Sequence, residues 1–490
     1  MAMTNRQNQK NDCFILLTID DMVPQNHLVR KLEAGIDFTF IYSKVEHLYS
    51  KAGRPSIDPV VLFKLLILNI VDGNNSMRKT CNRAQTDMAY RWFLGIDVYE
   101  SVPNYSTWSQ NYIRRYKDSS IFDDIFNEIL SQAIRRNFVD VTTVFGDGTH
   151  QKANANKNKN HKEEVELTAK KYEKAILEEI NDDRECIGLK PVESLIKKEL
   201  VNDEETGEVK EITETKTITV SNTDPESGLF HKGEKQKCFA YSHQTFCDKN
   251  GFVLITKAFP GNLHDSVTFF ETFDELNKRF PGMIQNVSLD AGYKVPAICR
   301  ELLEQGKIPL MPYTRPKTKK GYLKKNDYVY DEYYDFFICP NIKTLSYTLT
   351  NKSGYREYKC DPKDCQECPY KNQCTKSDAK TVTRHVWEEY VEQVNEIRYT
   401  QKWRDLYPRR KETIERVFAD CKEKFGMRFT RLKGLKKNQH QMLMVFATHN
   451  LKKMALWSWK TPFVPLFFCL YRAIFDIFEK NNKQKTRILI

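Results

Sequence analysis

The sequence predicts an α/β protein that begins with an all-helical region. Residues 60–71 are almost all apolar, a length and composition that suit a buried helix. Between residues 238 and 313, segments that alternate as strands do are interleaved with helical patterns. Such interleaving is typical of a sheet covered by helices. A chain of 490 residues is long enough for two or three domains.

The N-terminal region, residues 1–137, is expected to contain three helices. Asp58 can cap the first helix and Pro59 suits its first turn, while Ser76 can cap the second helix after a polar turn. The helices are expected over residues 60–71, over residues 77–94, and directly after residues 103–109.

Basic residues on these helices allow two interpretations. A helix-turn-helix unit would place one helix in the major groove of DNA, whereas an ordinary helical domain would expose its arginines to solvent. The basic residues that would contact DNA are Arg78, Arg83, Arg114 and Arg115.

Two acidic residues follow short strands. Residues 141–145 are rich in Val and Thr and lead into Asp147, which lies between two glycines. We therefore expect a strand whose C-terminal end carries one exposed carboxylate. Residues 286–289 lead in the same way into Asp290. Both acids are candidates for chemistry at a strand end.

A third acid, Glu415, lies in a segment with helical spacing. At about 100° per residue, Glu415 falls on the flank of an apolar stripe, with Lys411 and Lys422 on the same side. The stripe consists of Ile414, Val417, Phe418, Cys421 and Phe425. Taken singly, each acid is one of 65 in the chain and is more often a surface carboxylate.

Residues 151–236 are dense in Lys, Glu and Asn and are interpreted as an insertion that forms a solvated spacer. Within it, residues 154–160 are expected to be disordered and residues 167–200 to have helical character. The other expected elements are strands at 238–247, 252–257 and 307–313, a hairpin turn at 248–251, and helices at 267–279, 295–305 and 439–456.

Five cysteines follow one another closely, the last three with the spacing C-x2-C-x5-C. Four thiolates bind zinc tetrahedrally and can hold together a segment that has little core of its own. The alternative is a small lobe in which reduced cysteines pack. The predicted zinc ligands are Cys339, Cys365, Cys368 and Cys374, with Cys360 as the competitor.

Lys and Arg outnumber Asp and Glu by 77 to 65, which gives a net charge of +12 and a pI near 8.9. This excess suits a polyanion partner, and equally a basic enzyme. The start of the chain does not resemble a signal peptide, so we expect a cytoplasmic protein with reduced cysteines. The apolar segment 463–471 is too short and too interrupted to span a bilayer and predicts a packing or interaction helix instead.

Four segments, together with Lys422 and Gly426, resemble the DDE transposases, and among them the IS1182 group, which is related to the IS4 and IS5 elements. The resemblance extends from about residue 50 to about residue 455, with its parts in the order of the family. The segments are residues 145–150, 258–266, 289–294 and 410–418.

The resemblance implies a ribonuclease H-like catalytic core, an N-terminal domain that binds the terminal inverted repeats of an insertion sequence, and a homodimer that pairs the two ends. Such a protein would act on double-stranded DNA in the bacterial cytoplasm, at the nucleoid. The implied parts are the N-terminal domain (1–137), the first part of the core (138–332, with the insertion 151–236), a Cys-rich insertion (333–380), the second part of the core (381–456) and a tail (457–490).

The resemblance also implies the chemistry of the site. Asp147, Asp290 and Glu415 would hold two Mg²⁺ or Mn²⁺ ions about 3.5–4 Å apart, with Asp147 bridging them. Water would cleave one strand to free a 3′ hydroxyl, which would then attack target DNA. The cations that would hold the strand by its phosphates are Arg410, Lys411 or Lys422.

Two other functions are compatible with these features. One is a catalytically inactive, domesticated protein kept for its DNA-binding domain, and the other is a metal-dependent nuclease that never joins strands. His264, in the segment 258–266, is either an outer-shell or substrate contact or a loop histidine with a structural hydrogen bond.

Overall fold

The structure, a computed structural model, describes residues 16–460 except positions 51, 54, 75, 167–170, 196–197, 203–208, 214, 233–235 and 317. The chain divides into two compact units. Unit 1 is Met1–Phe138, Lys424–Gly426 and Leu443–Ile490, and unit 2 is Val139–Glu423 and Met427–Met442. The predicted packing helix at 463–471 lies outside the described residues. Among the helices that are described, none has the length and apolar character needed to cross a membrane.

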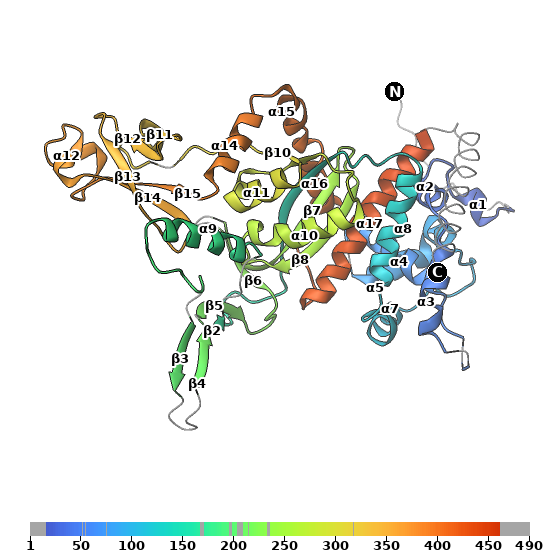
Figure 1. The fold of residues 1–490 in the computed structure, drawn as a ribbon. Coiled ribbons are helices and arrows are strands. Elements are labelled where there is room, and N and C mark those ends of the chain that lie inside the picture. The colour runs from blue at the N-terminus through green and yellow to red at the C-terminus, as the bar shows by residue number, and fades with distance from the viewer. Residues whose placement is uncertain are drawn as a thin grey trace, which may run out of the picture. The chain divides into compact units, whose positions relative to one another are not determined.

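Unit 1 is helical, and its centre is α4 (Pro59–Val71), which confirms the first predicted helix. The cap is as predicted, since Oδ1 of Asp58 accepts a hydrogen bond from the Val60 N–H at 2.7 Å. The ring of Phe63 is fully buried and packs against the rings of Trp108 and Tyr116, with centroids 5.5 and 5.1 Å away. The other α-helices of this unit between residues 16 and 138 are α1 (Ile19–Met22), α2 (Leu28–Gly35), α3 (Phe40–Val45), α5 (Met77–Thr86), α6 (Met88–Leu94), α7 (Tyr105–Asn111) and α8 (Ile121–Arg135), and Figure 1 labels all of them except α6.

The prediction of one helix over residues 77–94 is wrong, because the chain forms α5 and α6 there instead. Asp87 separates them, and its Oδ1 accepts hydrogen bonds from the N–H groups of Ala89 at 3.0 Å and Tyr90 at 3.3 Å. Those bonds cap the start of α6 and compete with continuation of α5. The cap of α5 by Ser76 is confirmed.

The third helix starts earlier than predicted. α7 begins at Tyr105, within residues 103–109, because Oδ1 of Asn104 accepts a hydrogen bond from the Ser106 N–H at 3.0 Å. Arg114 and Arg115 follow in a short π-helical segment, η2 (Tyr112–Tyr116).

The centre of unit 2 is a mixed sheet with strand order β10-β9-β1-β7, in which β8 also pairs with β7. β9 (Asn286–Ser288) pairs in parallel with β1 (Thr143–Lys152) and with β10 (Ile308–Leu310). β7 (Gln236–Asp248) is antiparallel to both β1 and β8 (Val253–Pro260). Strands are therefore confirmed wherever the sequence predicts them in this part of the chain, together with the hairpin at 248–251.

The insertion contains more strand than the sequence indicates. β2 (Asn160–Glu166), β5 (Thr215–Ser221) and β6 (Gly228–Lys232) continue the sheet beyond β7. The helix in the insertion, α9 (Glu173–Cys186), is shorter than the predicted 167–200. β3 (Lys198–Asn202) and β4 (Val209–Thr213) form a separate hairpin.

Disorder at residues 154–160 is a wrong prediction, because hydrogen bonds fix this segment as a turn. The Asn154 side chain donates to the carbonyl oxygen of Arg431 at 3.0 Å, and the Asn156 N–H donates to Oγ1 of Thr223 at 3.2 Å. The partners lie far away in the sequence, so the polar composition of the segment gives no sign of them.

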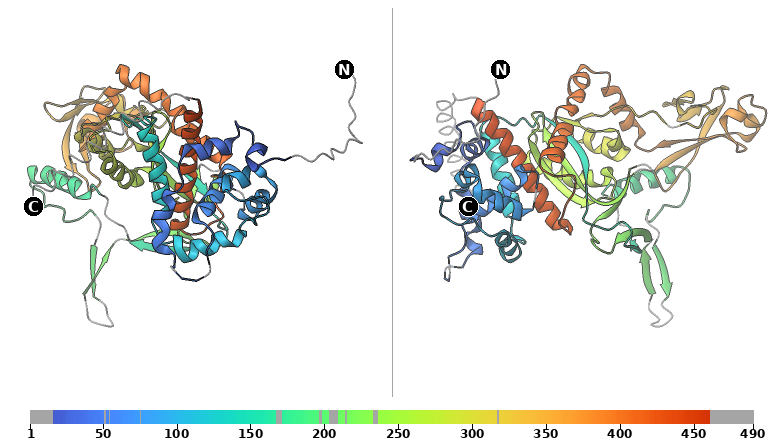
Figure 2. Two further views of the ribbon diagram at one scale, coloured as in Figure 1. Left: turned by 90° about the vertical axis from the view of Figure 1, so that its right-hand side faces the viewer. Right: turned by 180° about the vertical axis from the view of Figure 1, so that it is seen from behind.

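Two helices lie beside the central sheet in Figure 1 and in the rear view of Figure 2. α10 (Asp265–Arg279) contacts β7 and β8, and α11 (Pro296–Glu304) contacts β10. Both confirm predicted helices.

The helices that follow carry the third acid. After α14 (Glu388–Ile397) and α15 (Gln401–Leu406), the 3-10 segment η5 (Tyr407–Lys411) precedes α16 (Ile414–Lys424). Lys411 therefore does not share a helix with Glu415, contrary to the prediction, because Oγ1 of Thr413 donates to the Arg409 carbonyl at 2.8 Å and a turn separates the two elements. The last helix, α17 (Leu435–Lys460), is longer than the predicted 439–456.

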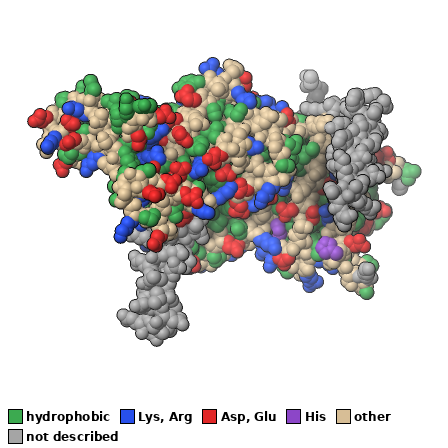
Figure 3. Space-filling view, in the orientation of Figure 1, with side chains coloured by type: hydrophobic (Ala, Val, Ile, Leu, Met, Phe, Trp, Pro, Cys, Tyr) green, Lys and Arg blue, Asp and Glu red, His purple; other side chains and the backbone are tan. Residues whose placement is uncertain are grey.

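Charged side chains are mixed on the surface. On the face shown in Figure 3, the Lys and Arg side chains are interspersed with Asp and Glu side chains and do not gather in one patch. The net charge of +12 is therefore not concentrated on this face.

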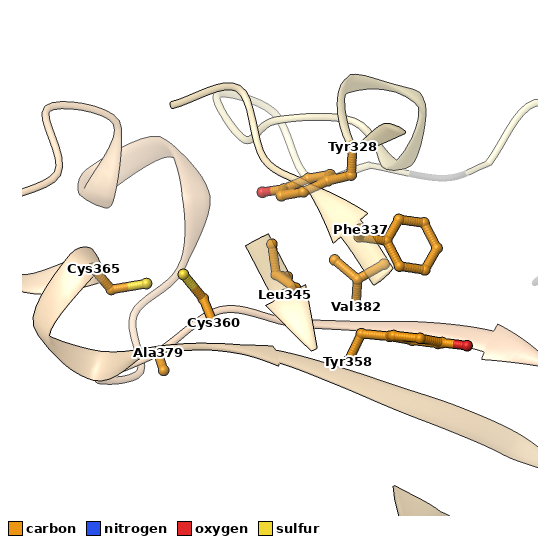
Figure 4. Packing of buried hydrophobic residues seen from close by; sticks show 8 residues of the cluster. All are labelled: Tyr328, Phe337, Leu345, Tyr358, Cys360, Cys365, Ala379 and Val382. Carbon is orange, nitrogen blue, oxygen red and sulfur yellow. The ribbon is translucent and has the colours of Figure 1, made fainter. Parts of the chain in front are cut away.

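The cysteine-rich segment forms a lobe around a five-stranded antiparallel sheet. Its buried core includes Phe337, Leu345 and Tyr358 together with Cys360 and Cys365, as Figure 4 shows. The strands are β11 (Val329–Asp331), β12 (Phe336–Ile338), β13 (Thr344–Thr350), β14 (Tyr355–Cys360) and β15 (Thr381–His385).

Candidate functional site

The strand register brings Asp147 and Asp290 to the same edge of the central sheet. Phe145 on β1 pairs in parallel with Ser288 on β9. Each acid lies two residues past this pair, on neighbouring strands whose backbones are about 4.8 Å apart. The two carboxylates thus start from adjacent positions, although 142 residues separate them in the sequence.

The predicted setting of Asp147 is wrong in two respects. β1 does not end at Phe145 but continues to Lys152, because it keeps pairing with β7, where Asp147 lies opposite Thr245. The side chain is also largely buried, with 19% of its surface exposed. Asp147 is thus an internal strand residue in a sheltered position.

Arg410 joins the two strands. Its guanidinium Nη2 lies 3.1 Å from Oδ2 of Asp147, and its Nη1 donates hydrogen bonds to the carbonyl oxygens of Gly146 at 2.9 Å and Ser288 at 3.1 Å. Arg410 is itself buried. This side chain therefore ties β1 to β9 directly beside the two acids, through contacts that use two of its nitrogens.

Asp147 lies in an unfavourable position for a negative charge. Burial raises the pKa of its carboxyl to about 7, even though the charge of Arg410 lowers it. The carboxylates of Asp290 and Asp265 raise it further. Acids that repel one another around a buried position are a donor set that a hard divalent cation would stabilise.

Glu415 and Tyr407 complete the neighbourhood. Glu415 is exposed on α16, beside the buried stripe of Ile414 and Val417, as predicted from the helical spacing. Burial is the main reason why the pKa of Tyr407 is raised, and the carboxylates of Asp290, Glu415 and Asp147 act in the same direction. The Tyr407 hydroxyl is therefore within electrostatic reach of all three predicted acids.

The acids do not form a finished metal site. Within the described ranges, no group of three or more His, Cys, Asp or Glu side chains is arranged so that it could hold a metal ion. This holds for the three acids and for the predicted cysteines alike.

Asp265, at the start of α10, is an additional acid that the strand pattern does not reveal. A Cβ atom built on Gly148 would lie 2.5 Å from Oδ1 of Asp265 and 3.3 Å from the Tyr293 hydroxyl, so a larger residue there would displace the Asp265 carboxylate. In the described structure this Oδ1 is buried without a hydrogen-bond partner. Burial and the charge of Asp290 raise the pKa of Asp265. The motif 258–266 includes Asp265, but nothing in its spacing indicates the contact with β1.

His264 has the structural role that the sequence left open as one alternative. Its Nδ1 accepts a hydrogen bond from the Ser266 N–H at 3.2 Å and caps α10. Because Nδ1 accepts this bond at the end of the helix, the cap sets the tautomer of the His264 ring.

The predicted DNA-binding cations differ in how they are held. Arg83 pairs with Asp72 at 2.7 Å and with Asp87 at 3.0 Å. Arg78 donates to the Tyr105 hydroxyl at 2.6 Å. Arg410 is buried and paired with Asp147, and Arg115 lies over the ring of Tyr49 at 4.4 Å. Lys422 on α16 is half-buried, and Arg114 and Lys411 are exposed.

Four cysteines belong to the buried cluster of the lobe or pack against it. Cys360 and Cys365 belong to the buried cluster, and Figure 4 shows their sulfur atoms facing each other. Cys339 and Cys374 pack against the same cluster, and Sγ of Cys374 lies 3.0 Å from the Tyr328 hydroxyl. Cys368, a predicted ligand, is not part of this packing, whereas Cys360, the competitor, is.

Two family models match the chain. One, described as "Transposase domain (DUF772)", matches residues 17–114, and the other, described as "Transposase DDE domain", matches residues 338–455. The two domains in this order are the architecture of IS1182-group transposases. The chain belongs to the DDE transposases. No curated protein matches the transposase in a sequence comparison.

The two matches cover part of the candidate site. The match to the DDE domain includes Arg410, Lys411, Glu415 and Lys422 of the transposase but neither Asp147 nor Asp290. The N-terminal match includes Arg78, Arg83 and Arg114.

Proposed function

We propose that this transposase binds the terminal inverted repeats of an insertion sequence and cleaves and joins DNA strands with Asp147, Asp290 and Glu415. The observation that carries the proposal is the register of β1 against β9, which brings two of these acids to adjacent positions. A sheet in which parallel strands adjoin one antiparallel strand supports the ribonuclease H-like core that the resemblance implies.

Mg²⁺ or Mn²⁺ fits the chemistry of this donor set. Oxygen ligands suit these ions. The charge of Arg410 acts on Asp147 and that of His264 on Asp265, but burial and the repulsion from Asp290 still raise the pKa of both carboxyls. When bound, the ions would activate an attacking oxygen and stabilise the leaving one. Because the acids are not arranged to hold a metal as they stand, Glu415 would have to approach Asp147 and Asp290 for the three carboxylates to hold the ions.

The chain's own residues have separate tasks in this proposal. Arg410 keeps β1 and β9 in register and offsets part of the charge of Asp147, so we assign it to positioning. Lys411 and Lys422 are then the cations proposed to hold the strand by its phosphates. A homodimer would bring two DNA ends together, and unit 1 would recognise each end.

The test uses the full transposase, Mg²⁺ and DNA that carries the element's own ends. Asp147→Asn, Asp290→Asn and Glu415→Gln are each expected to lower strand cleavage by at least about 1,000-fold, or about 4 kcal/mol of transition-state stabilisation, while binding of the ends is retained. Glu412→Gln, an exposed acid one turn before Glu415, is the matched control and should cleave normally.

The products separate the proposal from its alternatives. Joined strands are expected of a transposase, whereas nicks without joining would make the protein a nuclease and a shifted band without cleavage would make it a DNA-binding protein only. Cleavage that survives in one of the three variants would remove that residue from the site.

We also propose that the cysteine-rich lobe binds a structural zinc ion. Cys339, Cys365 and Cys374 lie around one buried cluster, and Cys360 or Cys368 would supply the fourth thiolate. Burial and the neighbouring Cys365 raise the pKa of Cys360, so without a metal its thiol keeps its proton.

A further inference from the structure

A basic and aromatic pocket lies in unit 2, outside the group of acids. The cavity has a volume of about 460 Å³ and is lined by Tyr313, Arg315, Pro316 and residues 324–327. This volume is within the range of about 300–1,000 Å³ that is usual for ligand pockets. The pocket contains the acid Asp327, and Lys325 is paired with Glu388 at 2.9 Å, so Arg315 and Lys324 supply its remaining positive charge.

Two further cations surround the ring of Tyr313. Nζ of Lys294 lies 5.2 Å and Cζ of Arg398 lies 4.8 Å from the ring centroid. Nζ of Lys294 donates to two neutral oxygens, the Pro312 carbonyl at 2.9 Å and the Asn395 side chain at 3.0 Å. These contacts do not neutralise its charge, and burial together with the charge of Arg398 lowers the pKa of Lys294. An anion beside the ring would relieve the repulsion between the two cations.

The strand register connects this pocket to the acids. Leu310 on β10 pairs in parallel with Ser288 on β9, so Pro312 and Asp290 each lie two residues past the same pair. Tyr313 follows directly and therefore leaves the sheet at the edge that carries Asp290. Neighbouring strands lie about 4.8 Å apart, so we expect one nucleotide strand to be able to reach both places.

Aromatic side chains also connect the neighbourhood of the acids with the segment that contains Tyr313. The ring of Trp403 stacks on the ring of Tyr407 with centroids 4.7 Å apart and an interplanar angle of 9°. Nε1 of Trp403 donates to the Met311 carbonyl at 3.0 Å, two residues before Tyr313. Tyr407, in electrostatic reach of the three acids, is thus linked through Trp403 to the segment that holds Tyr313.

The ring of Tyr313 and the cations around it together indicate which class of ligand would bind here. Aromatic faces stack on bases, and Lys and Arg bind phosphates, so alternating rings and cations suit a nucleic acid strand. The ring of Tyr313 is 39% exposed, and a base can reach it only when that base is unpaired. An acidic peptide would use the cations but would gain little from the row of rings.

We propose that Tyr313, Arg315, Lys294 and Arg398 bind one unpaired DNA strand, the one that leaves the carboxylate site. The inference rests on the proposed function, because it names the path of the DNA that this site would cut. Arg315 and Lys294 contact phosphates, and Tyr313 stacks on a base.

The test measures binding of a fluorescent single-stranded 12-mer of thymidine to the full transposase in EDTA, by anisotropy. Tyr313→Ala and Arg315→Ala are each expected to weaken binding about fivefold or more, and Tyr313→Phe, which keeps the ring, should bind as the wild type does. Tyr370→Ala removes a tyrosine of similar exposure, 41%, and Lys278→Ala removes an exposed cation beside a different cavity, so both should be without effect.

A second measurement locates the strand directly. The same oligonucleotide with one 5-iodouracil is irradiated with the protein, and the crosslinked peptide is identified by mass spectrometry. A crosslink at Tyr313 supports the inference. Crosslinks only in unit 1, or equal loss of binding in Tyr313→Ala and Tyr370→Ala, would overturn it.

The outcome is independent of catalysis, because the binding assay contains no metal. If the wild type cleaves element ends but the Tyr313 and Arg315 variants bind the 12-mer normally, the proposed function stands and the strand path is refuted. If the wild type does not cleave but binding depends on Tyr313, the strand site stands and the proposed function fails.

Discussion

At the scale of single residues, the site depends on how Asp147 and Arg410 share one buried position. The guanidinium of Arg410 offsets one charge and also bonds the carbonyl oxygens of both strands, which a lysine with its single nitrogen could not reproduce. Yet the pKa of Asp147 stays raised to about 7, since burial and the neighbouring acids outweigh this one cation. The metal-free site therefore stores unfavourable free energy that a bound cation would release.

This balance predicts how stability depends on pH. The pKa of Asp147 is about 7 in the folded protein and about 3.9 in an unfolded chain, so folding favours its protonated form. The contribution of Asp147 to stability is then most favourable below about pH 4 and is lost as the pH rises towards 7, by up to about 4 kcal/mol relative to Asp147→Asn, which cannot ionise. Urea denaturation of both proteins in EDTA between pH 4.5 and 8 measures the difference.

Added Mg²⁺ supplies the control for this experiment. If the acids hold the ion, Mg²⁺ should remove most of the loss in the wild type at pH 8 and have little effect on the Asn variant. Denaturation curves that stay parallel for the two proteins at every pH would contradict the assigned burial of Asp147.

At the scale of elements, the sequence predicts those whose signal is local. α4, β7, β8 and β9 are found from apolar periodicity, a capping residue or a turn, all of which lie within a few residues. β2 carries mostly polar side chains and is held by pairing with β5, whose residues are 49 to 61 positions away in the sequence, so the sequence of β2 resembles a spacer. Long-range pairing is what the local pattern lacks.

The same distinction applies to the site. Asp147, Asp290 and Glu415 are singled out by the resemblance of the segments that contain them, since the strand or helix context of each acid is by itself a common one. The burial of Arg410 and the approach of Asp265 to Gly148 depend on partners more than 100 residues away, and no spacing reveals them. The helical pattern predicts the wrong element for Lys411, because a turn at Thr413 interrupts the pattern.

The lobe offers a prediction at this scale, because its small core suggests that zinc stabilises it. We expect one zinc ion per chain by elemental analysis of the purified protein. Cys365→Ser should lose it, and Cys186→Ser, an exposed cysteine outside the lobe, should keep it.

Two variants identify the fourth cysteine that binds zinc. If Cys360→Ser loses zinc and Cys368→Ser retains it, the packing around Tyr358 identifies the ligand set, and the reverse result would favour the C-x2-C-x5-C spacing. Zinc-free protein that shows the same thermal transition as the zinc-bound form would contradict a structural role.

At the scale of the whole molecule, the charges that are free to meet DNA matter more than the net charge of +12. Cations already paired with carboxylates release fewer counterions when DNA binds. Since acids and bases are interspersed on the face shown in Figure 3, the exposed arginines of unit 1 must be considered one by one. Arg83 is held by ion pairs with Asp72 and Asp87, whereas Arg114 is exposed in η2.

The salt dependence of DNA binding should separate these two arginines. The affinity for a duplex that carries the element's end is measured by anisotropy between 50 and 200 mM salt. The logarithm of the association constant falls with the logarithm of the salt concentration, with a slope of about −0.9 per phosphate contacted. Arg114→Ala should make this slope shallower by about 1. Arg83→Ala should leave the slope unchanged and lower the melting temperature, because it breaks two ion pairs in the fold. If Arg83→Ala alone changed the slope, Arg83 would have to leave both carboxylates on binding, and the assignment of the DNA-binding face of unit 1 would have to be revised.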